Sequence, residues 1–186
     1  MTRRLRPRHL LVAGIAAAAA WAAPQAAVAS PSEADLPTVI QVEAGHKMFL
    51  EAHAVGVQIH ACDATLDGFG WRFVGPRADL YDDRGRLVST HFGGPTWQAT
   101  DGSRVVGQRV DGVTVDPTAI PWLLLSAAST AAGDDGDRLQ GTKFIQRIAT
   151  TGGLVPPPGE CNASTAGTVA EVPYTADYRF WKRTGG

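Results

Sequence analysis

From residue 37 onward, glycine or proline interrupts the chain about every eight to twelve residues, and this spacing limits the possible folds more than any other feature. Between the breaks lie short runs rich in valine, isoleucine, threonine and aromatic residues, which favour strands. We find no apolar stripe with the 3.6-residue period of a helix in this part of the sequence. We therefore expect an all-β protein, an antiparallel β-sandwich or barrel with little helix.

The expected strands have two distinguishable faces, because successive side chains of a strand point in opposite directions. In residues 57–62 the apolar side chains share one face, and Gln58, His60 and Cys62 share the other. Near the C-terminus one face carries the side chains of Tyr174, Ala176, Tyr178 and Phe180.

Two hairpins and one ambiguous segment complete the secondary-structure prediction. Turn residues at 82–85 and an Asp-Gly pair at 101–102 each lie between strand-like runs. A two-residue type I′ turn at Asp-Gly would place Trp97 opposite Val106. Residues 120–126 are mostly apolar, and their proline suits the start of either a helix or a buried strand. We favour the strand.

The first 29 residues have the pattern of a secretory signal peptide. Residues 1–9 carry four arginines and no acid, residues 10–23 are apolar, and Ala27 and Ala29 form a small-residue cleavage pattern. The apolar run is short for a membrane span, which needs about 20 residues, although an uncleaved anchor stays an alternative. We expect cleavage near Ala29 and a secreted or extracytoplasmic protein. Residues 30–36 would be a flexible lead-in, and residues 37–186 a single β-rich domain.

Charge argues against two classes of partner. The whole chain has 17 basic and 18 acidic residues, and the expected leader removes four arginines and no acid. The remaining chain then has 13 basic residues and a net charge of −5. Binding to nucleic acid or to an anionic membrane needs a positive face. We expect neither partner, and the sequence leaves the oligomeric state open.

The chain has two cysteines, Cys62 and Cys161. In an exported protein the default state of such a pair is a disulfide. Neither belongs to a C-x-x-C motif, so a thiol redox centre is not indicated. Asn162 begins an N-x-S sequence, and its glycosylation depends on the host.

No motif identifies a reaction or a cofactor. Ser103 lies near Asp101 and His91 in sequence, but the chain lacks the G-x-S-x-G element of many serine hydrolases. A pair of catalytic carboxylates would have to come from acids that turns and surfaces explain equally well. The catalytic residues therefore stay unknown, no cofactor is expected, and a non-enzyme is favoured. The enzymatic alternative is a secreted hydrolase or metal-dependent enzyme built from His53, His60, His91 and Asp101.

Histidines offer a weak alternative as metal ligands. His53, His60 and His91 are the candidates, but none forms a closely spaced pair such as H-x-H. A metal site would require the fold to bring them together.

Tryptophan offers a better indication of a ligand site. Rings can stack on sugars or aromatic ligands, whereas most tryptophans simply pack in cores. Trp97 follows a Gly-Gly-Pro break and lies close in sequence to other polar candidates. We predict a site for a glycan or small molecule formed by His91, Trp97, Gln98 and Asp101.

Several segments together resemble a known family. "GVQIHAC", "HFGGPTWQATDGSRVVG", "IPWLLLSA", "KFIQRIATTGG" and "VPYTADYRFW" are similar to the secreted bacterial and fungal family called domain of unknown function 3455. The similarity runs from about Pro37 to Trp181. It implies export and a single domain, but no catalytic residue. His60 replaces the tyrosine that is usual in the family, and Gln98 replaces an acid.

These observations favour one function and leave two open. The first is a non-catalytic binding module, secreted or in the cell envelope, for a glycan or small ligand. The second is the secreted enzyme described above. The third is a structural or stress-related extracellular protein.

Overall fold

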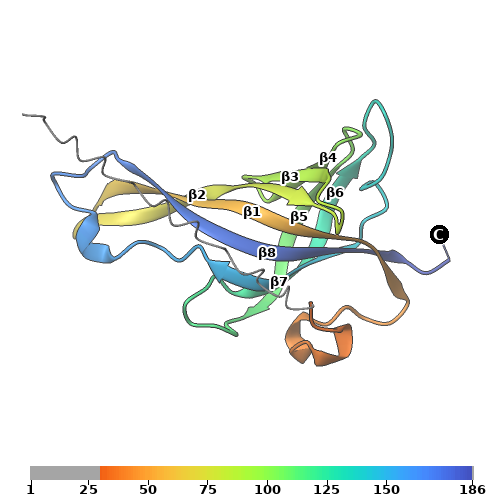
Figure 1. Cartoon of the computed structure of the whole chain (residues 1–186). Helices are drawn as coiled ribbons and strands as arrows, with labels where there is room; N and C mark the ends of the chain where they lie inside the picture. Colours follow the sequence, from red (N-terminus) through yellow and green to blue (C-terminus); the bar gives the residue numbers. More distant parts are fainter. Residues whose placement is uncertain (1–29, 186) are drawn as a thin grey trace, which may run out of the picture.

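The computed structural model describes residues 30–185, which form a closed barrel of eight antiparallel strands joined in sequence order (Figure 1). The prediction of an all-β fold is confirmed, and of the two architectures the barrel forms. The expected signal peptide lies outside the described residues. The strands are β1 (His46–Thr65), β2 (Gly68–Tyr81), β3 (Leu87–Phe92), β4 (Thr96–Ala99), β5 (Arg104–Val113), β6 (Trp122–Ala131), β7 (Phe144–Gly152) and β8 (Val169–Arg183).

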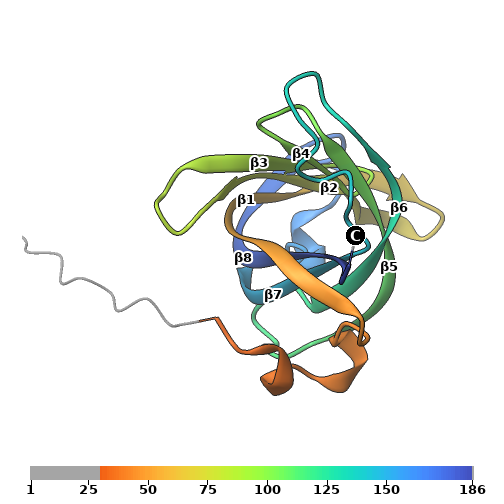
Figure 2. The ribbon, with the colours of Figure 1, turned by 90° about the vertical axis from the view of Figure 1, so that its right-hand side faces the viewer.

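Pairing of β1 with β8 closes the barrel, and Figure 2 shows the strands surrounding its interior. Three short 3-10 turns accompany the strands: η1 (Glu33–Asp35), η2 (Thr38–Ile40) and η3 (Pro158–Glu160). The ambiguous segment 120–126 is mainly strand, since β6 starts at Trp122. Neighbouring strands supply its backbone hydrogen bonds, which a helix would have made internally.

The interior follows the predicted alternation. The four inward side chains of β8, from Tyr174 to Phe180, are all buried in the main core. In β1 the buried face is the polar one, with Gln58 and His60, while the apolar residues of 57–62 are only partly buried. Which face of β1 points inward is set earlier in the strand, where Ala52 and Ala54 are buried between β8 and β2. Polar side chains are thereby carried into the barrel.

The chain before β1 packs on the outside of the barrel. Leu36 and Ile40 form a second apolar cluster with Leu124 and Ile148, which point outward from β6 and β7. The Gln146 side chain donates to the Ile40 carbonyl oxygen at 2.7 Å. Residues 30–36, expected as a flexible lead-in, form η1 and place the buried Leu36 in this cluster.

The β4–β5 hairpin forms, but its predicted register is wrong by one residue. Trp97 pairs with Val105, not Val106. The turn has three residues, because Ala99 N–H bonds to the Ser103 carbonyl and Gly102 N–H to the Ala99 carbonyl. Gly102 alone takes a left-handed conformation, at φ +83°, whereas a type I′ turn needs two such residues.

Asp101 and the loop between β6 and β7 close this end of the barrel. The Asp101 carboxylate accepts hydrogen bonds from Ser103 N–H (3.0 Å), Ser103 Oγ (2.6 Å) and Arg138 N–H (2.9 Å). Ser103 Oγ accepts from Leu139 N–H, and the Leu139 side chain is fully buried in the core. The hydrogen bond from Ser103 is the main reason that the pKa of Asp101 is lowered. Asp101 is therefore a structural residue of this end.

We expect Asp101→Ala to lower the free energy of unfolding by about 1–3 kcal/mol, because three donors lose their acceptor. Urea denaturation measures the change. Asp134→Ala is the matched control, since Asp134 is an exposed acid of the β6–β7 loop at the same end of the barrel. Equal stability of the two variants would contradict the closing role of Asp101.

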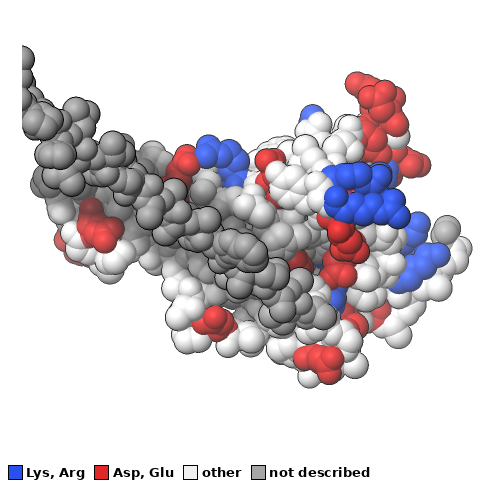
Figure 3. Space-filling view, in the orientation of Figure 1, with Lys and Arg blue, Asp and Glu red and all other residues white. Residues whose placement is uncertain are grey.

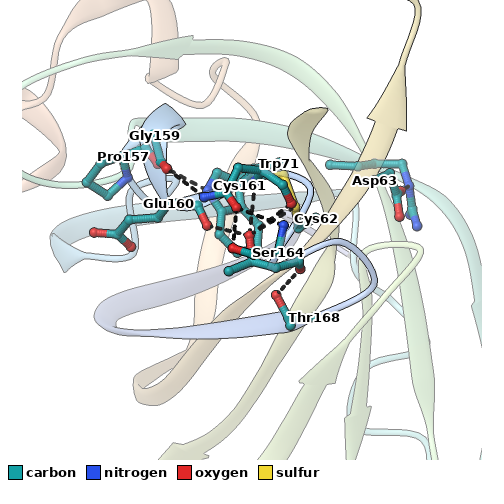
Figure 4. The surroundings of a disulfide bond; sticks show 12 residues. Cys62, Asp63, Trp71, Pro157, Gly159, Glu160, Cys161, Ser164 and Thr168 are labelled. Atoms are coloured by element: carbon teal, nitrogen blue, oxygen red, sulfur yellow. Dashed lines mark hydrogen bonds and ion pairs between the residues drawn. A yellow bond between two sulfur atoms is a disulfide. The ribbon is translucent and has the colours of Figure 1, made fainter. Parts of the chain in front are cut away.

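The predicted disulfide between Cys62 and Cys161 is confirmed (Figure 4). It joins the β1–β2 ribbon to the long β7–β8 loop. Around it, Cys62 N–H donates to the Thr168 carbonyl at 3.0 Å, and Trp71 Nε1–H to the Pro157 carbonyl at 3.2 Å. The loop is therefore held to the ribbon at several points.

The outer surface carries charge of both signs (Figure 3). Acidic side chains gather over the β6–β7 loop, where Asp134, Asp135 and Asp137 are exposed. In residues 30–185 there is no helix with the length and apolar character needed to cross a membrane.

Candidate functional site

A cavity of about 200 Å³ lies inside the barrel. Gly94 and Pro95 of the β3–β4 turn line it, so it lies toward the end opposite the Asp101 hairpin, since successive turns of such a barrel alternate between its ends. A cavity of about 150 Å³ holds benzene, so this one has room for a single ring with a small substituent. Its apolar wall is formed by Phe73, Val74, Trp97, Leu123 and Leu125.

A stack of two rings forms one side of the cavity. His91 on β3 and Trp97 on β4 are direct cross-strand partners, and their rings lie 4.2 Å apart at 7°. The Tyr178 ring contacts both rings edge-on. A Cβ on Gly107 would lie 3.0 Å from the indole, so a glycine at this point of β5 leaves space for the ring. The stack is almost fully buried, with 3% of His91 and 1% of Trp97 exposed.

His91 is a neutral hydrogen-bond acceptor in this site. Its Nδ1 lies 2.9 Å from the Thr96 carbonyl oxygen, so Nδ1 carries the proton and Nε2 has a free lone pair. Burial lowers the pKa of His91 to about 3, and the charge of Arg147 acts in the same direction against the Thr96 hydrogen bond. At neutral pH the imidazole is therefore uncharged.

Five buried polar atoms have no hydrogen-bond partner among the described residues. Three belong to side chains that line the cavity: Gln58 Nε2, Trp97 Nε1 and Tyr178 Oη. Burial raises the pKa of Tyr178, so its hydroxyl stays protonated. A buried polar group without a partner costs about 1–3 kcal/mol. The other two atoms are His60 Nδ1 and Tyr174 Oη.

Two arginines supply the positive charge of the cavity. Arg147 on β7 donates from Nε and Nη2 to the Pro121 carbonyl oxygen, at 3.1 and 2.8 Å. Arg109 on β5 also lines the cavity but is largely exposed. Among residues 30–185 neither has a carboxylate within 4.0 Å, and no acidic residue belongs to the cavity lining.

The structure brings together two of the four residues predicted to bind a ligand. His91 and Trp97 line the cavity, whereas Gln98 and Asp101 do not. Gln98 follows Trp97 on β4 and so points to the other face of the sheet, and Asp101 lies in the turn at the far end. Sequence reasoning missed the arginine of β7, although a charged residue between Ile145 and Ile148 was an available signal.

The three histidines considered as metal ligands are not brought together. His53 points outward, with its Nδ1 2.9 Å from Asp177 Oδ1. His60 is buried, with its ring 5.4 Å from that of Phe73, and it does not line the cavity with His91. In the part of the chain that the structure describes, no group of three or more His, Cys, Asp or Glu residues is arranged to hold a metal ion.

The tryptophans do not form a common platform either. Trp71 lies beside the disulfide loop, Trp122 packs against the outer apolar cluster, and Trp181 donates from Nε1 to the Gln146 side chain. Of these four tryptophans, Trp97 alone lines the cavity.

Fold and site together define a small antiparallel barrel whose cavity has an apolar wall and a few polar groups. Barrels of eight strands either fill their interior with side chains or hold one small ligand. A family model described as "Protein of unknown function (DUF3455)" matches residues 43–182, and the chain belongs to this family. A search of curated proteins and a search of solved structures each returned no match.

Proposed function

We propose that this protein is a non-catalytic module that binds one small molecule inside its barrel. The observation that carries the proposal is the set of three unpartnered polar atoms in the wall of a cavity large enough for a ring. The polar groups of a ligand would form hydrogen bonds with these atoms, while its ring would pack against the apolar wall.

A small ring suits the cavity better than a glycan chain. Stacking on a sugar needs an accessible ring face, and Trp97 has 1% of its surface exposed, with His91 stacked against its ring. The volume of about 200 Å³ also suits a molecule slightly larger than benzene.

The chemistry of the lining favours binding over catalysis. It contains no serine, cysteine, lysine, aspartate or glutamate that could act as a nucleophile or acid. With a pKa of about 3, His91 is a weak general base at neutral pH.

Location outside the cytoplasm is a part of the proposal. Its support is the leader pattern of residues 1–29 together with the disulfide, which persists in oxidising compartments. The remaining charge of −5 supports the expectation that neither nucleic acid nor an anionic membrane is a partner.

A cavity-filling substitution tests the proposal. We expect ligand-observed NMR to detect phenol and benzyl alcohol on the natural protein, and Leu123→Phe to weaken that binding by about tenfold, because the added ring occupies the cavity. Trp97→Ala removes part of the wall and should also change the affinity.

The matched control is Val110→Phe, which introduces the same ring at a position on β5 that is 55% exposed. It should bind like the natural protein. Failure of every single-ring probe to bind at millimolar concentration would refute the proposal, as would equal binding by the Leu123 and Val110 variants. Conversion of a bound probe would show that the site is catalytic.

A further inference from the structure

We infer that the ligand of this cavity is a compact apolar monocarboxylate, of about the size of benzoate, whose carboxylate binds Arg147. The inference rests on the proposed function and names the class of molecule that the site selects. It is carried by the charge of the cavity rather than by its shape.

Within residues 30–185, the absence of a carboxylate beside Arg147, an arginine that lines the cavity, is the first observation. On the outside of the barrel Arg77 lies 2.7 Å from Glu171, and Arg179 lies 3.0 Å from Glu51. Arg147 has no such partner among the described residues, although it is on the inward face of β7 and lines the cavity. A charge turned into a barrel costs free energy unless an opposite charge accompanies it.

The donors of Arg147 are the second observation. A guanidinium has five N–H donors, and the bonds to Pro121 use one on Nε and one on Nη2. Three donors remain, enough for the two-point contact that arginine makes with a carboxylate. The Pro121 carbonyl also fixes the plane of the guanidinium, so little side-chain entropy is lost on binding.

None of the other polar groups in the cavity carries a negative charge that would repel a carboxylate or compete with it for Arg147. His91 is neutral, Tyr178 is protonated, and no acidic side chain lines the cavity. Arg109, which is exposed, adds a second positive charge nearer the solvent. Such a charge raises the association rate of an anion more than its residence time.

The size of the cavity limits the rest of the molecule. About 200 Å³ leaves room for one ring and one small substituent, and the wall is built from aromatic and leucine side chains. A dicarboxylate would leave its second charge in this wall, so the cavity suits a single acid group.

Calorimetric titration with benzoate and benzyl alcohol tests the inference, because the two probes have the same ring and nearly the same size. We expect benzoate to bind about tenfold or more tightly than benzyl alcohol. Arg147→Gln should abolish this preference and leave the affinity for benzyl alcohol within about threefold. The matched control is Arg77→Gln, which removes an outer arginine and should keep the preference.

Two further variants keep the result interpretable. Arg147→Lys retains a charge but loses the planar pair of donors, and should weaken the binding of benzoate by about three- to tenfold. Unchanged benzoate binding by this variant would count against the two-point contact. This result can be read even if Arg147→Gln fails to fold. Arg109→Gln should mainly slow association and reduce its dependence on salt.

The outcomes separate this inference from the proposed function. Equal affinity for the two probes, or a preference that survives in Arg147→Gln, would overturn the carboxylate site while leaving a small-molecule cavity. Absence of binding by both probes would overturn the two proposals together.

Discussion

Removal of the disulfide through Cys62→Ala and Cys161→Ala together is expected to lower the free energy of unfolding by about 4–5 kcal/mol in the chain-entropy model. The two residues are 99 positions apart, so the bond closes a long loop and removes much freedom from the unfolded chain. Double replacement avoids a free thiol, and alanine suits the buried positions because both cysteines are almost fully covered.

Urea denaturation of the double variant and of the natural protein measures the difference. Natural protein treated with a reductant should approach the stability of the variant, while the variant itself should not respond to the reductant. A loss below about 1 kcal/mol would mean that the hydrogen bonds between the β7–β8 loop and the ribbon are sufficient to hold it.

Acid is expected to destabilise the barrel through His91. The pKa of His91 is about 3 in the folded protein, against an ordinary value of 6.5, so between these two values the unfolded chain binds the proton more readily. The contribution to stability is fully present above pH 6.5 and is lost as the pH falls toward 3. In that window it changes by up to about 1.4 kcal/mol per pH unit.

Stability measured between pH 4 and 6 for the natural protein and for His91→Gln checks this expectation. Glutamine can still donate to the Thr96 carbonyl but does not titrate. The slope of the unfolding free energy against pH should therefore correspond to about one bound proton fewer in the variant. His53→Gln is the control, since His53 is an exposed histidine on the outer face. Identical slopes for the natural protein and His91→Gln would contradict a buried neutral His91.

The local parts of the fold were predictable because strand alternation is a local property. The alternation near the C-terminus predicted which side chains of β8 between Tyr174 and Phe180 share a face, and the expectation of export predicted the cysteine pair. The hairpin register was not predictable from the Asp-Gly pair alone. Asp101 takes its hydrogen bonds from Ser103 and from a distant loop, and these select the three-residue turn.

The candidate site was half predictable. His91 and Trp97 lie on neighbouring strands joined by a short turn, so their proximity followed from the sequence. Their neighbours in sequence, Gln98 and Asp101, point to another face or lie at another end. The sequence therefore indicated the correct segment but included two residues that do not reach the cavity.

By itself the sequence determined the all-β class, the cysteines that pair, and which side chains share a face, because these follow from local periodicity and a small number of chemical groups. Only the tertiary structure decided that the polar face of β1 turns inward and that Arg147 meets His91, Trp97 and Tyr178 around one cavity. The reason is that these contacts depend on the long-range pairing of β1 with β8, which closes the barrel and which no local pattern encodes.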